Sequence, residues 1–179
     1  MRLTDFPSGG LSRRFRKSAP LLVHWAVCGS VFWWSGGMTE FDDLSPYSYL
    51  PDSVPSGVSV LNVGWLDPGQ EFPMGKVPEG FLEKLGALCA RHTQARMRGW
   101  HSCQLPHPSG APLYPITIEV GDQPVALGRA EIRVVGRNGA WLAAPDLIYH
   151  YVEAHGYLPP EAFIDGVMSD RLPGEVHNQ

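Results

Sequence analysis

The sequence lacks most of the features that would assign it to a class at once. Its three cysteines (Cys28, Cys89 and Cys103) are too few for a disulfide framework, so free thiols in a reducing compartment are the simpler interpretation. Charged residues make up only 18% and hydrophobic residues 44%, which is typical of a globular chain. The sequence contains no G-x-S-x-G elbow, no phosphate-binding P-loop and no dinucleotide fingerprint. Its 179 residues suffice for one sizeable core but not for two ordinary domains.

The first 37 residues differ in composition from those that follow. Arg13 and Arg14 precede an apolar stretch at 19–34, which is the outline of a signal peptide. As a membrane span this stretch is short, and it contains His24 and Gly29. The favoured hypothesis is a wrongly assigned start, with Met38 as the true one; export and a membrane anchor are the alternatives. We therefore treat 1–37 as an extension outside the fold, 38–168 as one domain and 169–179 as a frayed tail.

Charge is the main guide to partners. Residues 38–179 hold nine basic and seventeen acidic residues, a net charge of −8. Such a domain repels phosphate backbones and anionic lipid, so nucleic acid and membranes are disfavoured and a basic protein partner is favoured. The sequence predicts a cytoplasmic protein, or an exported or tethered one if 1–37 is genuine, and it predicts no particular oligomeric state.

Local patterns predict an α+β fold: a single small domain with a mixed or antiparallel sheet and two to three helices. Apolar residues at helical spacing predict helices at about 78–91, 145–155 and 160–168. The strict alternation after Ala130 predicts a β-hairpin at about 130–143, with Glu131 and Arg133 facing outward. Further strands are expected at 58–65, 98–103 and 114–120, and an irregular surface arm at 43–59.

The stretch 100–107 (WHSCQLPH) has the spacing of metal ligands. Thiolate and imidazole are the donors that Zn²⁺ prefers, in sets of four or of three plus water. On a strand, His101 and Cys103 would point to the same face. A turn at Pro106 could bring His107 round, and His150 or His155 could complete the set from the helix. The opposing hypothesis is a partly buried cysteine flanked by unrelated histidines, with no cofactor.

The two helical histidines have other interpretations as well. His155 lies in the last turn, where it could interact with the helix dipole or be a satisfied core group. His150, with Asp146 and Glu153, could be a carboxylate-tuned acid–base group or part of a solvated ionic stripe. Cys103 could also pair with His101 or His107 as a nucleophile, although no oxyanion hole or orienting group is evident. The sequence therefore favours a protein that is not an enzyme.

Four segments resemble a known family: 61–67 (LNVGWLD), 98–103 (RGWHSC), 130–134 (AEIRV) and 144–157 (APDLIYHYVEAHGY). The family consists of small bacterial proteins, mostly from GC-rich bacteria, known only as a domain of unknown function. The resemblance covers about Met38 to Met168. The family pattern Gly-aromatic-His-x-Cys-x-aromatic-Cys implies a zinc site that retains His101 and Cys103 and loses one thiolate at Pro106. His107 is the available substitute.

Two functional hypotheses follow. The first is a non-catalytic binding module of the immunity-protein kind, which would dock an acidic surface on a partner. The second is a zinc-binding domain, structural or hydrolytic, that uses His101, Cys103 and a histidine from His107, His150 or His155.

Overall fold

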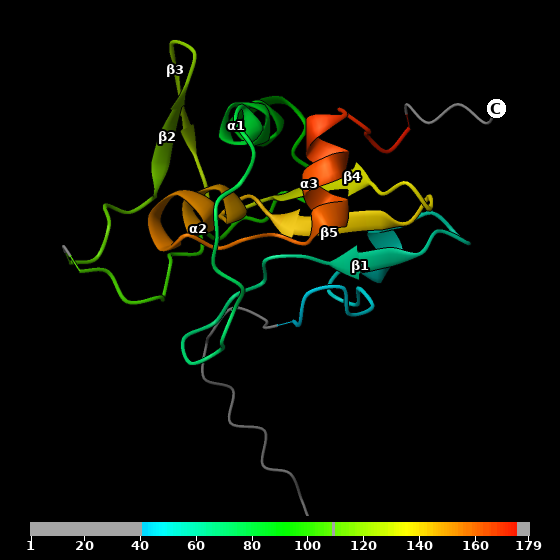
Figure 1. Cartoon of the computed structure of the whole chain (residues 1–179), viewed down its shortest axis with the longest axis horizontal. Coiled ribbons are helices and arrows are strands. Elements are labelled where there is room, and N and C mark those ends of the chain that lie inside the picture. The colour runs from blue at the N-terminus through cyan, green and yellow to red at the C-terminus, as the bar shows by residue number, and fades with distance from the viewer. Residues whose placement is uncertain (1–40, 109, 175–179) are drawn as a thin grey trace, which may run out of the picture. The chain divides into compact units, whose positions relative to one another are not determined.

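The computed structural model describes residues 41–108 and 110–174, which Figure 1 draws in colour. The predicted extension 1–37 and residues 175–179 of the predicted tail lie outside these residues. The described chain confirms an α+β fold. Its elements, in chain order, are the 3-10 helix η1 (Pro51–Ser53), β1 (Val60–Asn62), α1 (Phe81–Arg91), β2 (Thr117–Val120), β3 (Gln123–Ala126), β4 (Glu131–Val135), β5 (Trp141–Pro145), α2 (Ile148–His155) and α3 (Glu161–Met168).

The main sheet is mixed and has the strand order β1-β5-β4. β4 and β5 form the predicted hairpin, with Ile132 opposite Ala144, while β1 runs parallel to β5 on its other side. β2 and β3 form a separate antiparallel hairpin, which stands beside α1 (Figure 1). Two parallel strands need a long crossover between them. The chain from Asn62 to Trp141 provides one, so β1 can pair parallel with β5 while β4 pairs antiparallel with it.

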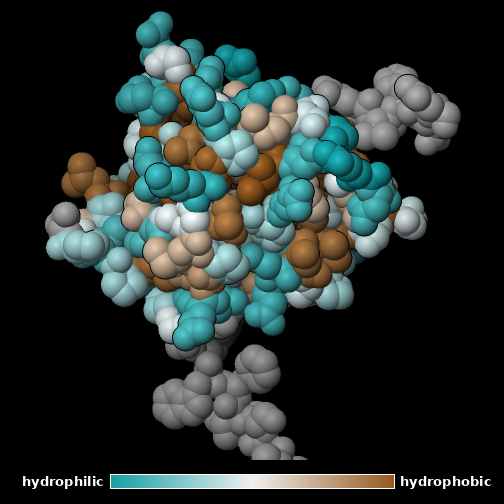
Figure 2. Space-filling view, in the orientation of Figure 1, coloured by the Kyte–Doolittle hydropathy of each residue, from teal (hydrophilic) through white to brown (hydrophobic). Residues whose placement is uncertain are grey.

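The helices cover one face of the main sheet. α3 packs on β4 so closely that a Cβ on Gly166 would lie 2.8 Å from Cγ2 of Val134. α1 contacts both α2 and α3, so the three helices form one layer (Figure 1). On the face shown in Figure 2, hydrophilic and hydrophobic residues are interspersed. This face thus shows no continuous apolar area.

The N-terminal arm covers the other face of β4. Side chains alternate along a strand, so Arg133 points away from the helices that Val134 contacts. There Arg133 donates to the carbonyl oxygen of Ser53 at 2.9 Å and to Glu131 at 2.9 Å. The prediction that Glu131 and Arg133 face solvent is therefore wrong: both are 2% exposed. The alternation itself holds, but the arm, which was expected to be a surface segment, buries the second face.

The helices begin slightly later than the sequence predicts. Gly80, with φ of +78°, is left-handed and immediately precedes α1, so the helix starts at Phe81 rather than near Pro78. Pro145 still belongs to β5, which delays α2 to Ile148. Its C-terminal end matches the prediction, because Gly156 takes the left-handed conformation just after His155.

The predicted strand at 98–103 does not form. Met97 donates its N–H to the carbonyl oxygen of Arg129, and His101 donates to that of Gly128. Between these two hydrogen bonds the chain advances by four residues from Met97 to His101, but by only one residue from Gly128 to Arg129. The segment 97–101 therefore bows out and cannot form a regular ladder with its neighbour. The structure adds β3, which the sequence did not indicate because its four residues include Pro124.

The start of the predicted tail packs against the sheet. Arg171 accepts a backbone hydrogen bond from Val135 and donates its side chain Nε to the carbonyl oxygen of Val135. Leu172 is 9% exposed. Residues 171–172 thus pack against the fold, and fraying of the tail stays a prediction. None of the helices within 41–108 and 110–174 is both long enough and apolar enough to cross a membrane.

Candidate metal centre

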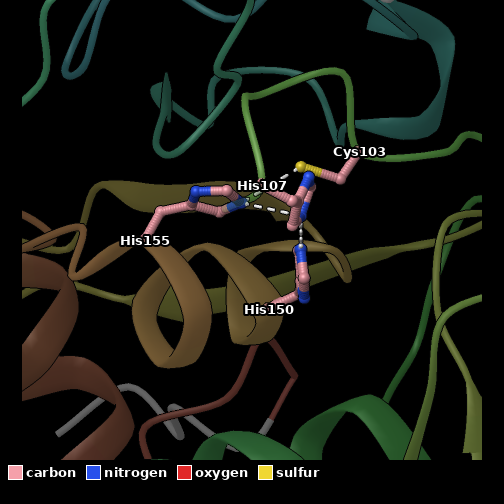
Figure 3. A group of neighbouring side chains, drawn as sticks. All are labelled: Cys103, His107, His150 and His155. Carbon is pink, nitrogen blue, oxygen red and sulfur yellow. Dashed lines mark hydrogen bonds between the residues drawn. The ribbon is translucent and has the colours of Figure 1, made fainter. Parts of the chain in front are cut away.

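Four of the five candidate ligands meet at one point. The Sγ of Cys103 and ring nitrogens of His107, His150 and His155 all lie within 4.8 Å of one another. In Figure 3, Cys103 and His107 approach from the loop, and His150 and His155 extend from α2. Among the described residues, this is the group of His, Cys, Asp and Glu side chains with the geometry of a metal site.

Three of the distances in this cluster lie close to those between ligands of a tetrahedral zinc ion. Nε2 of His107 lies 3.0 Å from Nε2 of His150 and 3.1 Å from Nε2 of His155. Sγ of Cys103 lies 3.3 Å from Nε2 of His155. Bond lengths of about 2.0 Å to nitrogen and about 2.3 Å to sulfur would place two nitrogens about 3.3 Å apart, and nitrogen and sulfur about 3.6 Å apart. A small contraction or expansion of the cluster would therefore accommodate the ion.

Hydrogen bonds alone do not account for this convergence. A ring nitrogen carries either one hydrogen or one in-plane lone pair, so it serves one strong hydrogen bond. Nε2 of His107 nevertheless has two other imidazole nitrogens within 3.1 Å. One of these contacts must lack a well-directed proton. A cation between the rings would accept a lone pair from every nitrogen at once.

The electrostatics of the cluster favour neutral imidazoles. Burial, followed by the neighbouring His155 and His107, lowers the pKa of His150 to about 4. Burial and His107 also lower the pKa of His155. Neutral imidazole is the form that ligates a metal ion. Burial raises the pKa of the Cys103 thiol, and a backbone hydrogen bond from Leu105 lowers it by less. Without a cation this group is therefore a thiol.

The backbone at Gly128 positions the loop that carries Cys103. Asp146, at the start of the turn into α2, accepts a hydrogen bond from the Gly128 N–H at 2.7 Å. The Gly128 carbonyl oxygen in turn accepts from the His101 N–H, two residues before Cys103. This chain of contacts links the α2 end of the site to the loop end. Burial raises the pKa of Asp146 to about 6, which its hydrogen bonds from backbone N–H groups oppose.

His101 is the predicted ligand that does not join the cluster. Because 98–103 is not a strand, His101 and Cys103 do not share a face. His101 instead lines a different cavity, next to Trp65, Met97 and Glu131. His107 lies at the cluster in its place, together with both histidines of α2.

The other interpretations of the helical histidines are changed by the structure. His150 is only 7% exposed, so it does not belong to a solvated stripe. Asp146 is directed at the backbone of Gly128 and Arg129, and Glu153 is exposed, so this trio forms no acid–base group. His155 is the last residue of α2, and its ring contacts Cys103 and His107.

Fold and cluster together define a small α+β protein with a candidate mononuclear metal centre. The chain belongs to the family described as Domain of unknown function (DUF7919), whose family model matches residues 39–168. The resemblance to a domain of unknown function is thereby confirmed. Comparison with curated proteins and with solved structures gave no match.

Proposed function

We propose that the chain is a zinc-binding domain in which one ion, held by Cys103, His107, His150 and His155, fastens the loop at 103–107 to helix α2. The observation that carries the proposal is the convergence of three imidazole nitrogens and one sulfur at ligand-to-ligand distances. Zn²⁺ fits because it prefers this mixture of soft thiolate and imidazole in tetrahedral geometry.

The role that fits best is structural. Four protein ligands fill a tetrahedral zinc site, whereas a hydrolytic site retains a position for water. The four residues also come from two distant segments, so an ion would cross-link a loop without regular structure to a helix of the core. The hydrolytic alternative would require one of these side chains to leave the ion, and no described contact favours that.

Elemental analysis of the purified full-length chain tests the proposal. We expect about one zinc ion per chain, and loss of this zinc in Cys103→Ser and in His150→Ala. His101→Ala is the matched control, because His101 is close to Cys103 in sequence but outside the cluster. This variant should retain its zinc. Absence of metal from the folded parent, or equal loss in His101→Ala, would contradict the proposal.

Cobalt substitution gives a second, spectroscopic test. Co²⁺ in a tetrahedral site with one thiolate absorbs strongly in the visible range and shows a sulfur-to-metal charge-transfer band. We expect both features in the parent and loss of the charge-transfer band in Cys103→Ser. A weak octahedral spectrum would indicate that water and carboxylates, rather than this cluster, hold the ion.

A non-catalytic role in binding a basic protein partner stays a prediction, based on the charge of −8 of residues 38–179. It is compatible with a structural ion, which would stabilise the domain while its surface binds the partner. Recovery of a specific partner that dissociates at moderate salt would support it.

A further inference from the structure

One continuous stretch of the fold carries basic residues and no acidic ones. Residues 84–118 contain no aspartate or glutamate, although residues 38–179 as a whole carry a net charge of −8. The same stretch holds Lys84, Arg91, Arg96 and Arg98. The electrostatic potential near this segment is therefore expected to be positive, although the net charge of the domain is negative.

A groove lies beside this segment. Residues of the α1 end and the following loop form one wall, and β3 with its continuation forms the other. The groove has a volume of about 360 Å³. Its polar and aromatic lining is Thr93, Arg96, Trp100, Gln123, Arg129 and Asp146. Two guanidinium groups therefore border one recess of the size that small ligands occupy.

Neither guanidinium is neutralised by a carboxylate of the described residues. Across residues 41–108 and 110–174, the ion pairs involve Lys84, Arg133, Arg137 and Arg171, and not Arg96 or Arg129. Asp146 is the one carboxylate of the lining, and its two oxygens face the backbone N–H groups of Gly128 and Arg129. The charge of both arginines is thus available to a ligand.

Both arginines are also held in place. Nη2 of Arg96 donates to Oγ1 of Thr93 at 2.8 Å. The guanidinium carbon of Arg129 lies 4.6 Å from the ring centroid of Trp100, a cation–π contact. Side chains that are already ordered lose less conformational entropy when they bind a ligand.

The strand β3 adds a neutral donor. Leu127 donates its N–H to Ile116 across the hairpin, so the alternation of an antiparallel pair directs the N–H of Ala126 away from β2. Pro124, at the equivalent outward position, has no N–H. One backbone N–H on this outer edge is therefore available, while proline disfavours the addition of a whole peptide strand.

We propose that this groove binds a small soluble phosphate ester, with Arg96 and Arg129 as charged partners and the Ala126 N–H as a neutral donor. Two unpaired guanidinium groups match a dianion better than a single carboxylate, and their planar N–H pairs fit phosphate oxygens. The proposal is independent of zinc, since none of the four cluster residues lines the groove.

NMR titration of the full-length chain with inorganic phosphate tests this. We expect saturable shifts of the backbone N–H signals of Thr93, Arg96 and Ala126, and none with acetate at matched ionic strength. Arg96→Gln should weaken phosphate binding at least about tenfold, because it removes one charged donor. The variant should still fold, since Arg96 is exposed and does not belong to the core. Arg98→Gln is the matched control: it removes one charge from the same segment but does not line the groove.

Arg129 provides a second, independent check. Arg129→Lys retains the charge and loses the bidentate geometry, so we expect weaker binding than the parent and stronger binding than Arg129→Gln. Three results would overturn the proposal: no saturable shifts with phosphate, equal shifts with acetate, or equal weakening by Arg96→Gln and Arg98→Gln. The last two would indicate screening of a diffuse charge rather than a site.

Discussion

Two polar clusters each fasten an irregular segment to the core, and they differ in how their donors and acceptors balance. The ionic cluster holds the N-terminal arm on β4: Tyr47 donates to Oε1 of Glu131, while Arg133 donates to Oε2 of Glu131 and to both oxygens of Ser53. The imidazole cluster holds the loop at 103–107 on α2.

The ionic cluster is complete within the chain. Arg133 brings five N–H donors and Glu131 brings two acceptor oxygens, and each of the two carboxylate oxygens receives a hydrogen bond. In the imidazole cluster, Nε2 of His107 has two other imidazole nitrogens within 3.1 Å, and one ring nitrogen serves only one strong hydrogen bond. The comparison shows that a buried polar cluster is best interpreted by counting its donors and acceptors. The imidazole cluster has more close contacts than directed protons can serve, which is the observation behind the proposed ion.

The largest effect should come from removal of the ion. We expect a chelator to lower the free energy of unfolding of the zinc-loaded chain by at least about 4 kcal/mol, the stabilisation given by a ligand at a thousand times its dissociation constant. Thermal unfolding with and without chelator measures this. Cys103→Ser should be insensitive to the chelator. If the chelator does not change the melting temperature of the parent chain, the imidazole cluster is not held by an ion and does not differ from the ionic cluster in this respect.

Disruption of the ionic cluster should cost slightly less and leave zinc untouched. Arg133→Met leaves Glu131 buried without its charge partner, so we expect a loss of about 3–5 kcal/mol. The double variant Glu131→Leu/Arg133→Met should recover much of this loss, because no charge then remains buried. Denaturant unfolding measures both. Equal losses in the single and double variants would show that packing, and not the unpaired charge, dominates.

A substitution at Gly128 should link the loop geometry to the metal centre. A Cβ at this position would lie 2.2 Å from the His101 carbonyl oxygen, and φ is +100°. We expect Gly128→Ala to cost about 2–3 kcal/mol and to weaken zinc binding without changing a ligand, because the segment before Cys103 must move.

Gly139→Ala is the matched control for Gly128→Ala. Its φ of +80° imposes the same kind of backbone strain, but nothing lies within 4 Å of the added Cβ. It should cost about 1 kcal/mol and leave zinc affinity unchanged. Competition with a chromophoric chelator measures the affinity of both variants. Equal zinc affinities would show that the loop position does not depend on Gly128.

The smallest effect concerns pH in the zinc-free chain. Because the pKa of His150 is about 4 in the folded state and about 6.5 when unfolded, the unfolded state binds more protons between these values. Stability should therefore fall as pH decreases from about 6.5 to about 4, by roughly 1–2 kcal/mol after solvent screening is allowed for. His150→Gln should flatten this dependence. A parent and variant with parallel pH profiles would assign the effect to other groups.

The sequence predicted the elements better than their contacts. The apolar spacing at about 78–91, 145–155 and 160–168 predicted the three helices, and the alternation after Ala130 predicted the hairpin, because burial of one face imposes a period on the chain. The period could not reveal that the arm covers the second face of β4. Glu131 and Arg133 have the same residue types and spacing whether they face water or Ser53.

The same division holds for the candidate metal centre. Residue type alone selected all four members of the cluster, since thiol and imidazole are recognisable donors wherever they occur. Spacing also selected His101 as a partner of Cys103, because it assumed a strand, whereas the structure has no strand there and leaves His101 outside the cluster. Spacing also argued against His150 and His155 as partners. They are five residues apart, which on an ideal helix places their side chains about 140° apart around the axis.

Which donors meet was decided by tertiary structure alone. The contacts that define the cluster join residues 43 to 52 positions apart in the chain. Such contacts depend on where α2 lies against the loop, which follows from the packing of β4, β5 and Asp146 rather than from any local pattern. The sequence by itself determined the helices, the hairpin and the set of possible ligands. Packing determined which ligands share one point, because local periodicity carries no information on distances between separate elements.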